Sequence, residues 1–218
     1  MAVWAYLQPD ELYGKFVLSP ERYDPRRESV VVGGVPVRRL VMFVRQTVSP
    51  STSDESPCLV LDTTHAHEGV IRCPGVPVSR TSLGSMKKRI EANDIIISRL
   101  RPYLRQVAYV DSEIARWTGD VMLLCSTEFF VLRSLGENDV AFLVPFLLSE
   151  SVQNILSASQ EGGHHPRFDE RTLGELIVPS EIIGARDELS AAIRESVRMF
   201  RHSEATIASC VSRISDMR

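Results

Sequence analysis

Basic side chains with the chemistry to bind nucleic acid are concentrated in one stretch of this sequence. Residues 80–105 contain seven arginines and lysines against two acidic residues, Glu91 and Asp94, so the stretch has a formal charge of +5 (seven minus two). Arginine forks pair with phosphates and with the guanine edge, and a tyrosine can stack on a base or bond a phosphate. The predicted DNA-binding residues here are Arg80, Lys87, Lys88, Arg89, Arg99, Arg101, Tyr103 and Arg105. The alternative is a solvated basic face, or arginines paired with carboxylates elsewhere in the chain.

Two polar segments outside this stretch are further candidates for DNA contact. The turn at residues 63–68 carries His65 and His67, and it is read either as a recognition loop or as an incidental surface turn. Zinc is disfavoured, because it needs four convergent ligands and the sequence has no Cys-x-x-Cys pair. The loop at residues 162–167 begins with two glycines, which permit close approach of the backbone to a phosphate, although glycine at a helix end is usually a cap. Its predicted contacts are His164, His165 and Arg167.

The sequence lacks the motifs that would make it an enzyme. It contains no Gly-x-Gly-x-x-Gly cofactor loop, no Walker lysine loop, no His-Glu-x-x-His helix and no Gly-x-Ser-x-Gly elbow, and the Asn/Asp-Pro-Pro-Tyr signature of amino-methyltransferases is also missing. We therefore expect a non-catalytic chain without a cofactor of its own. The four scattered cysteines are expected to be free thiols in a reducing cytoplasm, and the longest apolar run is too short to span a membrane.

The elements that must position these residues are strands followed by helices. Strands are predicted at residues 58–62, 69–71, 94–98, 105–110 and 127–132, with strands and a Gly33-Gly34 turn within residues 30–48. Helices are predicted at residues 140–160 and 169–176, followed by a short extended exit at residues 177–179. The expected fold class is α/β (α+β), in which a small mixed-sheet domain of residues 1–183 precedes a long helix in residues 184–218.

The C-terminal helix is predicted from residues 187–217, which contain neither glycine nor proline. Its apolar positions recur in steps of four and three, which is the heptad pattern of a coiled coil. We expect a partner helix along this seam, because a small domain cannot bury the whole stripe of such a helix. The alternative is a terminal helix that folds back on its own domain. Glu204 occupies a seam position and is expected either to face a basic residue across the seam or to mark where the seam opens. The predicted interface residues are Ile193, Val197, Phe200, Glu204, Ile207, Val211 and Ile214.

Five segments, in order along the chain, resemble those of type I restriction-modification specificity subunits. The most characteristic is NDIIISRLRPYLRQVAYV (residues 93–110), which is similar to the family's Gly-Asp-Ile strand with its Arg-Pro-Tyr-Leu turn. The others are LSPERYDPRR (18–27), STEFFVLRS (126–134), FLLSESVQNILSASQEGG (146–163) and LGELIVPS (173–180). The sequence departs from the family in three ways: Asn93 replaces the usual glycine, only Pro179 remains of the exit motif, and there is one half instead of two.

The resemblance implies a target-recognition domain that reads double-stranded DNA and a helix that docks a methyltransferase. S-adenosylmethionine and the reaction on adenine would then belong to the partner methyltransferase subunit. Because there is one half, we expect two copies to pair through residues 187–217 as a homodimer that reads two inverted half-sites. The rival interpretation, which the net charge of −3 slightly favours, is an adaptor of a defence complex that uses the helix and does not bind DNA.

Overall fold

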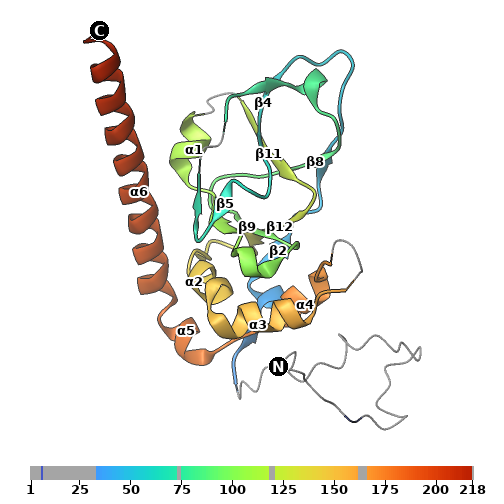
Figure 1. Cartoon of the computed structure of the whole chain (residues 1–218). Helices are drawn as coiled ribbons and strands as arrows, with labels where there is room; N and C mark the ends of the chain where they lie inside the picture. The colour runs from blue at the N-terminus through green and yellow to red at the C-terminus, as the bar shows by residue number, and fades with distance from the viewer. Residues whose placement is uncertain (1–5, 7–32, 73–74, 118–120, 162–165, 218) are drawn as a thin grey trace.

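The computed structural model describes residue 6 and residues 33–72, 75–117, 121–161 and 166–217. They form a head of stacked layers and a long C-terminal helix that runs along it (Figure 1). This agrees with the expected fold class of mixed sheets followed by a long helix. Two of the predictions, the segment at residues 18–27 and the histidine pair at 164–165, lie outside the described residues.

The middle layer of the head is a four-stranded antiparallel sheet with both faces buried. Its order is β10 (Val107–Tyr109), β9 (Ile95–Ser98), β12 (Phe129–Ser134) and β2 (Val41–Phe43). Because successive side chains of a strand point to opposite faces, Ile95 and Ile97 enter one core while Ile96 enters the other. The run of three isoleucines is therefore explained by a sheet that is covered on both sides.

A five-stranded mixed sheet covers one face of this middle layer. Its order is β3 (Thr47–Val48), β8 (Lys87–Arg89), β11 (Met122–Ser126), β4 (Pro57–Leu61) and β7 (Val78–Ser79), with β11 parallel to β4. A hairpin of β5 (Ala66–His67) and β6 (Val70–Ile71) and the helix α1 (Ser112–Trp117) complete this side. Neither the central strand β11 nor α1 was predicted, because an apolar run without alternation does not distinguish a strand from a helix.

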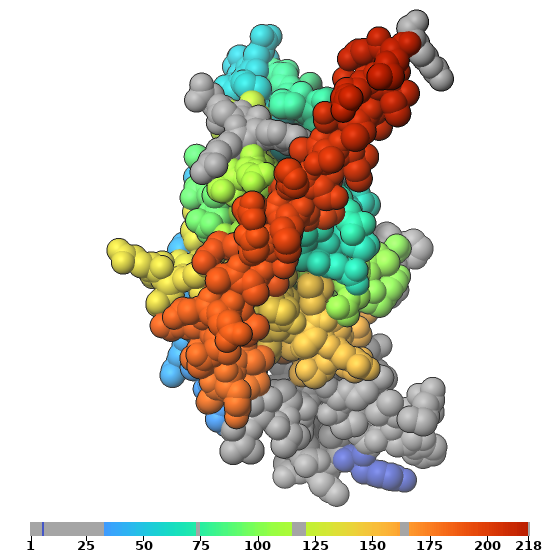
Figure 2. All heavy atoms as spheres, turned by 90° about the vertical axis from the view of Figure 1, so that its left-hand side faces the viewer, coloured from blue at the N-terminus to red at the C-terminus, as the bar shows by residue number. Residues whose placement is uncertain are grey.

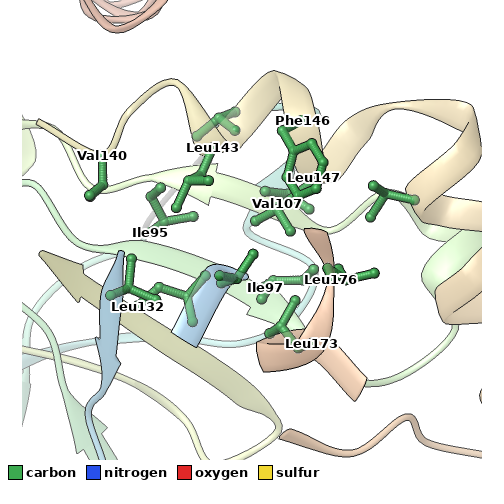
Figure 3. Close-up of a cluster of buried hydrophobic side chains, with 14 of the residues drawn as sticks. Ile95, Ile97, Val107, Leu132, Val140, Leu143, Phe146, Leu147, Leu173 and Leu176 are labelled. Carbon is green, nitrogen blue, oxygen red and sulfur yellow. The ribbon is translucent and has the colours of Figure 1, made fainter. Parts of the chain in front are cut away.

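Short helices cover the other face of the middle sheet. They are α2 (Leu143–Leu148), α3 (Glu150–Ala158) and α4 (Glu170–Glu175). Figure 3 shows side chains of the sheet, such as Ile95 and Leu132, facing Leu143 and Phe146 of α2 and Leu173 near the end of α4. The prediction of α4 is confirmed, and the side chain of Asp169 caps it by accepting from the Thr172 N–H at 2.7 Å.

The prediction of one continuous helix over residues 140–160 was wrong. Ser149 is in an extended conformation (φ −63°, ψ 147°) and separates α2 from α3. Its hydroxyl donates to the carbonyl oxygen of Phe146 at 2.7 Å, which satisfies an acceptor at the end of α2. A serine can thus end one helix and begin the next within a region whose apolar periodicity is unbroken.

The first strand of the described head pairs with the strand at which the chain leaves it. Strand β1 (Val35–Pro36) is antiparallel to β13 (Ile177–Val178), which confirms the predicted extended exit. Gly34 approaches this exit so closely that a Cβ atom there would lie 2.4 Å from the carbonyl oxygen of Val178, and its φ is +142°. The predicted Gly33-Gly34 turn is therefore required by the contact with β13 as well as by the turn.

Gly34→Ala is expected to lower the free energy of unfolding by about 2–3 kcal/mol, because both the backbone angle and the contact with Val178 must change. Gly33→Ala is the matched control. A Cβ atom at Gly33 (φ +85°) would meet only the Ser180 hydroxyl, at 3.7 Å, so the expected loss is about 1 kcal/mol. Urea unfolding of the two variants measures the difference, and equal losses would contradict the proposed role of the close approach.

The long helix α6 (Arg186–Ser215) follows a short helix, α5 (Ser180–Gly184), and its two halves have different surroundings. Figure 2 shows the helix crossing one face of the head. In the first half Val197 is 3% exposed and Ile193 packs against the main core. Every residue from 205 to 217 is exposed, and Ile207, Val211 and Ile214 are 59–63% exposed. The first part of the predicted seam is thus covered by the chain's own head.

A buried ion pair marks the point where α6 leaves the head. Nε and Nη2 of Arg201 both donate to the carboxylate of Asp111, at 3.2 and 2.9 Å. Nη1 of Arg201 also pairs with Glu204 at 2.6 Å. The side chains of Arg201 and Asp111 are 7% and 9% exposed. The basic residue that Glu204 contacts is on its own helix, so the expectation that Glu204 faces a basic residue across the seam, or marks where the seam opens, stays a prediction.

Candidate nucleic-acid interface

The predicted DNA-binding residues of the basic stretch lie on two sets of elements. The first surrounds η6 (Pro102–Leu104), the single turn that connects β9 to β10, and includes Arg99, Arg101, Tyr103 and Arg105. Arg167 joins this group because residues 100 and 167 form an isolated β-bridge. The second group lies on the five-stranded sheet, with Lys87, Lys88 and Arg89 on β8 and Arg80 at the start of η5 (Arg80–Ser82).

The turn around η6 presents its residues to solvent through an uncommon backbone conformation. Arg101 and Arg105, which flank η6, have φ angles of 45° and 52°, a left-handed conformation that few residues other than glycine adopt. Tyr103 is 66% exposed and Leu104 is 41% exposed. Within the described residues the Arg101 side chain makes no hydrogen bond or ion pair, and it is exposed. An exposed arginine and an exposed aromatic ring are thus held on one bend.

Beside this turn, one carboxylate holds two arginines. Arg167 donates to both oxygens of Glu128, at 3.0 and 2.8 Å, and Nε of Arg99 donates to the same carboxylate at 2.8 Å. The side chains of Arg99 and Arg167 are each 36% exposed, and that of Glu128 is 25% exposed. The hydrogen bond from Arg167, together with that from Arg99, lowers the pKa of Glu128 to about 2.

A stability difference that depends on pH follows from the pKa of Glu128. Because the folded-state pKa of about 2 lies below the ordinary value of 4.5, the ionised carboxylate stabilises the fold above pH 4.5. This contribution is lost as the pH falls from about 4.5 to about 2. We expect Glu128→Gln to be about 2–3 kcal/mol less stable than the wild type at pH 7, with the gap closing across that window. Urea unfolding at several pH values measures it, and a constant gap would contradict the assignment.

Two of the other predicted cations are paired with carboxylates that lie outside the basic stretch. Arg80 pairs with Asp54, and Arg105 pairs with Glu68 at 3.0 Å. Counting Asp54, Glu68 and Glu128, three further negative charges reduce the formal charge of the patch from +5 to +2. The alternative considered for the sequence, arginines paired with distant carboxylates, therefore applies to much of the patch.

The three basic residues of β8 also have hydrogen-bond or ion-pair partners within the chain. Lys87 donates to the Ser85 hydroxyl at 2.6 Å, and Arg89 lies 3.7 Å from Glu91. Lys88 donates to the carbonyl oxygen of Phe129 at 2.7 Å and lies over the Phe130 ring. Burial lowers the pKa of Lys88, which is consistent with a structural role for this side chain.

The histidine turn meets the η6 turn through its acidic neighbour. The Glu68 N–H donates to the carbonyl oxygen of Arg105 at 3.1 Å, which places His67 near that end of η6. His65 instead accepts at Nδ1 from the Asp62 N–H at 2.9 Å, a local bond that holds the turn. Among the described residues no group of three or more histidine, cysteine or acidic side chains is placed to hold a metal ion.

The Asn93-Asp94 pair before β9 has a structural role that explains one departure from the family pattern. Asn93 has a φ of 73°, where glycine is the usual choice and asparagine is among the residues best able to replace it. Asp94 is 1% exposed, accepts from the Glu91 N–H at 2.8 Å, and receives two hydrogen bonds from Arg133 at 2.7 and 2.8 Å. This pair therefore fixes the start of β9 and, through it, the η6 turn at its other end.

Two solved structures share this arrangement of sheets and long helix. A chain of a type I restriction-modification system, from work on complex assembly and conformational transition, aligns with a TM-score of 0.59 and 20% identity, over 86% of this chain and 49% of that one. The HsdS subunit from Thermoanaerobacter tengcongensis aligns with a TM-score of 0.54 and 19% identity, over 84% of this chain and 47% of that subunit. The chain has the HsdS fold.

The likeness to HsdS is one of structure. No protein-family model and no curated protein matches the sequence. The chain spans about half the length of the two solved chains with which it aligns. Among the described helices, none combines the length and the apolar character needed to cross a membrane. The HsdS fold is nevertheless the one that the resemblance of the sequence segments implied, and it extends over most of the chain.

The residue of this site that the sequence analysis missed is Glu128. Phe129 pairs with Ser98 in the antiparallel register of β12 and β9, so the preceding Glu128 lies opposite Arg99. Both strands had been predicted, but the pairing between them had not. Aligning the two strands as antiparallel neighbours would have been the signal, because it brings one acidic and one basic side chain face to face at the strand ends.

Proposed function

We propose that this chain is the sequence-specific DNA-recognition subunit of a restriction-modification or related defence complex. It directs a partner adenine methyltransferase, which binds S-adenosylmethionine and carries out the reaction, so this chain is not itself an enzyme. The observation that carries the proposal is the HsdS fold over at least 84% of the chain, with the exposed turn of Arg101 and Tyr103 at one edge. Residues 1–183 are the recognition domain and residues 184–218 the docking helix.

Two copies of the chain would complete a reader of two inverted half-sites. The chain spans about half of an HsdS-type chain, and the end of α6 leaves Ile207, Val211 and Ile214 exposed on one stripe. Exposed apolar residues at heptad spacing favour a partner helix, and an antiparallel pair gives the two-fold symmetry of an inverted site. The contacts between copies would lie beyond Arg201, since the earlier seam residues pack on the head.

The competing proposal is an adaptor that uses α6 and does not bind DNA. The net charge of −3 and the ion pairs of Arg80, Arg99 and Arg105 favour it. The two proposals differ in how DNA binding by the chain should depend on salt concentration. A chain that neutralises phosphates loses DNA affinity steeply as salt is raised, whereas an adaptor has no such affinity to lose.

The test is DNA binding and site-specific methylation by the full chain. Purified chain should bind duplex DNA with a steep dependence on salt, and Arg101→Ala should weaken binding and reduce the salt slope by about 1. Arg198→Ala is the matched control, because that arginine lies on α6 and pairs with Glu195. Methylome sequencing of a host with and without the gene should reveal a bipartite adenine site. Failure to bind DNA, with no change in the methylome, would reject the proposal.

The paired arrangement has its own test. Light scattering should give the mass of two chains, and replacing Ile207, Val211 and Ile214 together with serine should give single chains with an unchanged head. A lone wild-type chain, both free and bound to the methyltransferase, would reject the pair. Glu204→Leu should change oligomeric state or partner choice if Glu204 sets the register of the seam.

A further inference from the structure

Arg99 is held in place at both its backbone and its side chain. Its N–H donates to the carbonyl oxygen of Glu128 at 3.0 Å, and its carbonyl oxygen accepts from the Phe168 N–H at 3.3 Å. Nε of the guanidinium is bound to the Glu128 carboxylate, whereas its two terminal nitrogens have no hydrogen-bond partner among the described residues. One edge of the fork is therefore fixed and the other is available at a side chain that is 36% exposed.

Glu128 cannot easily swing away from Arg99, because Arg167 holds both of its oxygens. The carboxylate is ionised at neutral pH, since its pKa is about 2. Any group that docks on Arg99 thus lies near a permanent negative charge. The Glu128 carboxylate offsets the charge of one of the two arginines that it binds, so a phosphate is attracted less strongly here than by an arginine without a carboxylate. The edge of a base is neutral and depends on hydrogen bonds, so this offset does not weaken its binding. A base edge also benefits from an arginine whose orientation is already set.

Arg101, two residues further on, has the opposite environment. It is exposed, it has no ion pair or hydrogen bond within the described residues, and no carboxylate offsets its charge. An exposed guanidinium without an ion pair suits a phosphate, which attracts it by charge from many directions. The two arginines lie on the same turn but differ in whether a carboxylate holds them.

We propose that Arg99 reads the guanine edge in the major groove, that Glu128 is its positioning residue, and that Arg101 holds a backbone phosphate. The terminal nitrogens of Arg99 would donate to O6 and N7 of guanine, the pairing that arginine makes most often with a base. This assignment rests on the proposed DNA-reading function and names which side chain gives it sequence preference.

The experiment compares the base preference and the salt dependence of matched variants. The full chain is used to select duplexes from a random-sequence pool, and Arg99→Ala, Arg101→Ala and Glu128→Gln are taken through the same selection. For Arg101→Ala we expect the wild-type sequence to be selected, with uniformly weaker binding and a salt slope reduced by about 1. For Arg99→Ala we expect one guanine position to become degenerate, with discrimination there falling about 10- to 100-fold.

Glu128→Gln tests the positioning role. We expect the same guanine position to relax, while binding to unrelated DNA rises and its salt slope steepens, because two arginines have lost their carboxylate. A residue that only stabilised the fold would not change preference at a single base position. Arg99→Lys, which keeps the charge but loses the planar fork, is the second variant and should also relax that position.

The inference and the proposed function fail in different ways. A wild-type chain that enriches no sequence would reject the proposed function. A wild-type chain that enriches a site, while Arg99→Ala only weakens binding to every sequence as Arg101→Ala does, would overturn the inference alone. Unchanged base preference in Glu128→Gln would remove the positioning role of Glu128.

Discussion

Arg133→Ala should lower the free energy of unfolding by about 3–5 kcal/mol, because it leaves a buried carboxylate without its cation. Asp94 is 1% exposed and receives two hydrogen bonds from Arg133, which crosses from β12 to the start of β9. With arginine removed, the Glu91 N–H is the remaining hydrogen-bond donor to the Asp94 carboxylate among the described contacts. Chemical denaturation followed by circular dichroism measures the loss.

Glu91→Ala provides the control for Arg133→Ala. Glu91 also pairs with Arg133, at 3.0 Å, but its side chain is 50% exposed. An exposed pair of this kind contributes about 1 kcal/mol or less, so the control should be close to wild type. If both variants lost the same stability, the buried position of Asp94 would not be what makes its pair with Arg133 strong.

Asp111→Ala should be comparably damaging, with an expected loss of about 3–5 kcal/mol. It would remove the carboxylate that faces Arg201, whose side chain is 7% exposed. It would also remove the acceptor for the N–H groups of Glu113 and Ile114 in the first turn of α1, at 3.1 and 3.0 Å. We therefore expect faster amide hydrogen exchange in both α1 and α6, in addition to the lower stability.

Glu204→Ala is the control for Asp111→Ala, because Glu204 is the second and more exposed carboxylate that binds Arg201. Glu204 binds the same arginine at 2.6 Å, but its side chain is 36% exposed. We expect a loss below about 1 kcal/mol, with exchange in α1 unchanged. Protection of α6 that survived Asp111→Ala would indicate that the apolar contacts of Val197 hold the helix without the ion pair.

The sequence was sufficient to predict the elements whose pattern is local. The strands at β9, β12 and β4 carry branched or aromatic residues in short apolar runs, and the structure contains all three. The long helix was equally clear from its heptad repeat and the absence of glycine and proline. Residues that depend on their immediate neighbours, such as the cap Asp169 and the turn glycine Gly33, belong to the same category.

Properties that depend on distant pairing could not be predicted in this way. The charge of residues 80–105 was counted along the chain, whereas Asp54, Glu68 and Glu128 reach those arginines in space from outside the stretch. The heptad seam of α6 was read as one interface, but its first half packs on the head because Arg201 meets Asp111, ninety residues away. Sequence pattern reveals which face is apolar, and only the fold reveals what covers it.

The position of the last anchor of α6, the ion pair of Arg201 with Asp111, has a mechanical consequence. About 14 residues follow Arg201 in the helix, so its free end extends roughly 21 Å beyond the contact with Asp111. A tilt of about 10° at that contact would move the tip by roughly 4 Å, close to the ~3.4 Å step between base pairs. In the proposed pair of chains, the stiffness of the contacts between α6 and the head, of which this ion pair is the last, would therefore govern how tightly the spacing between the two half-sites is defined.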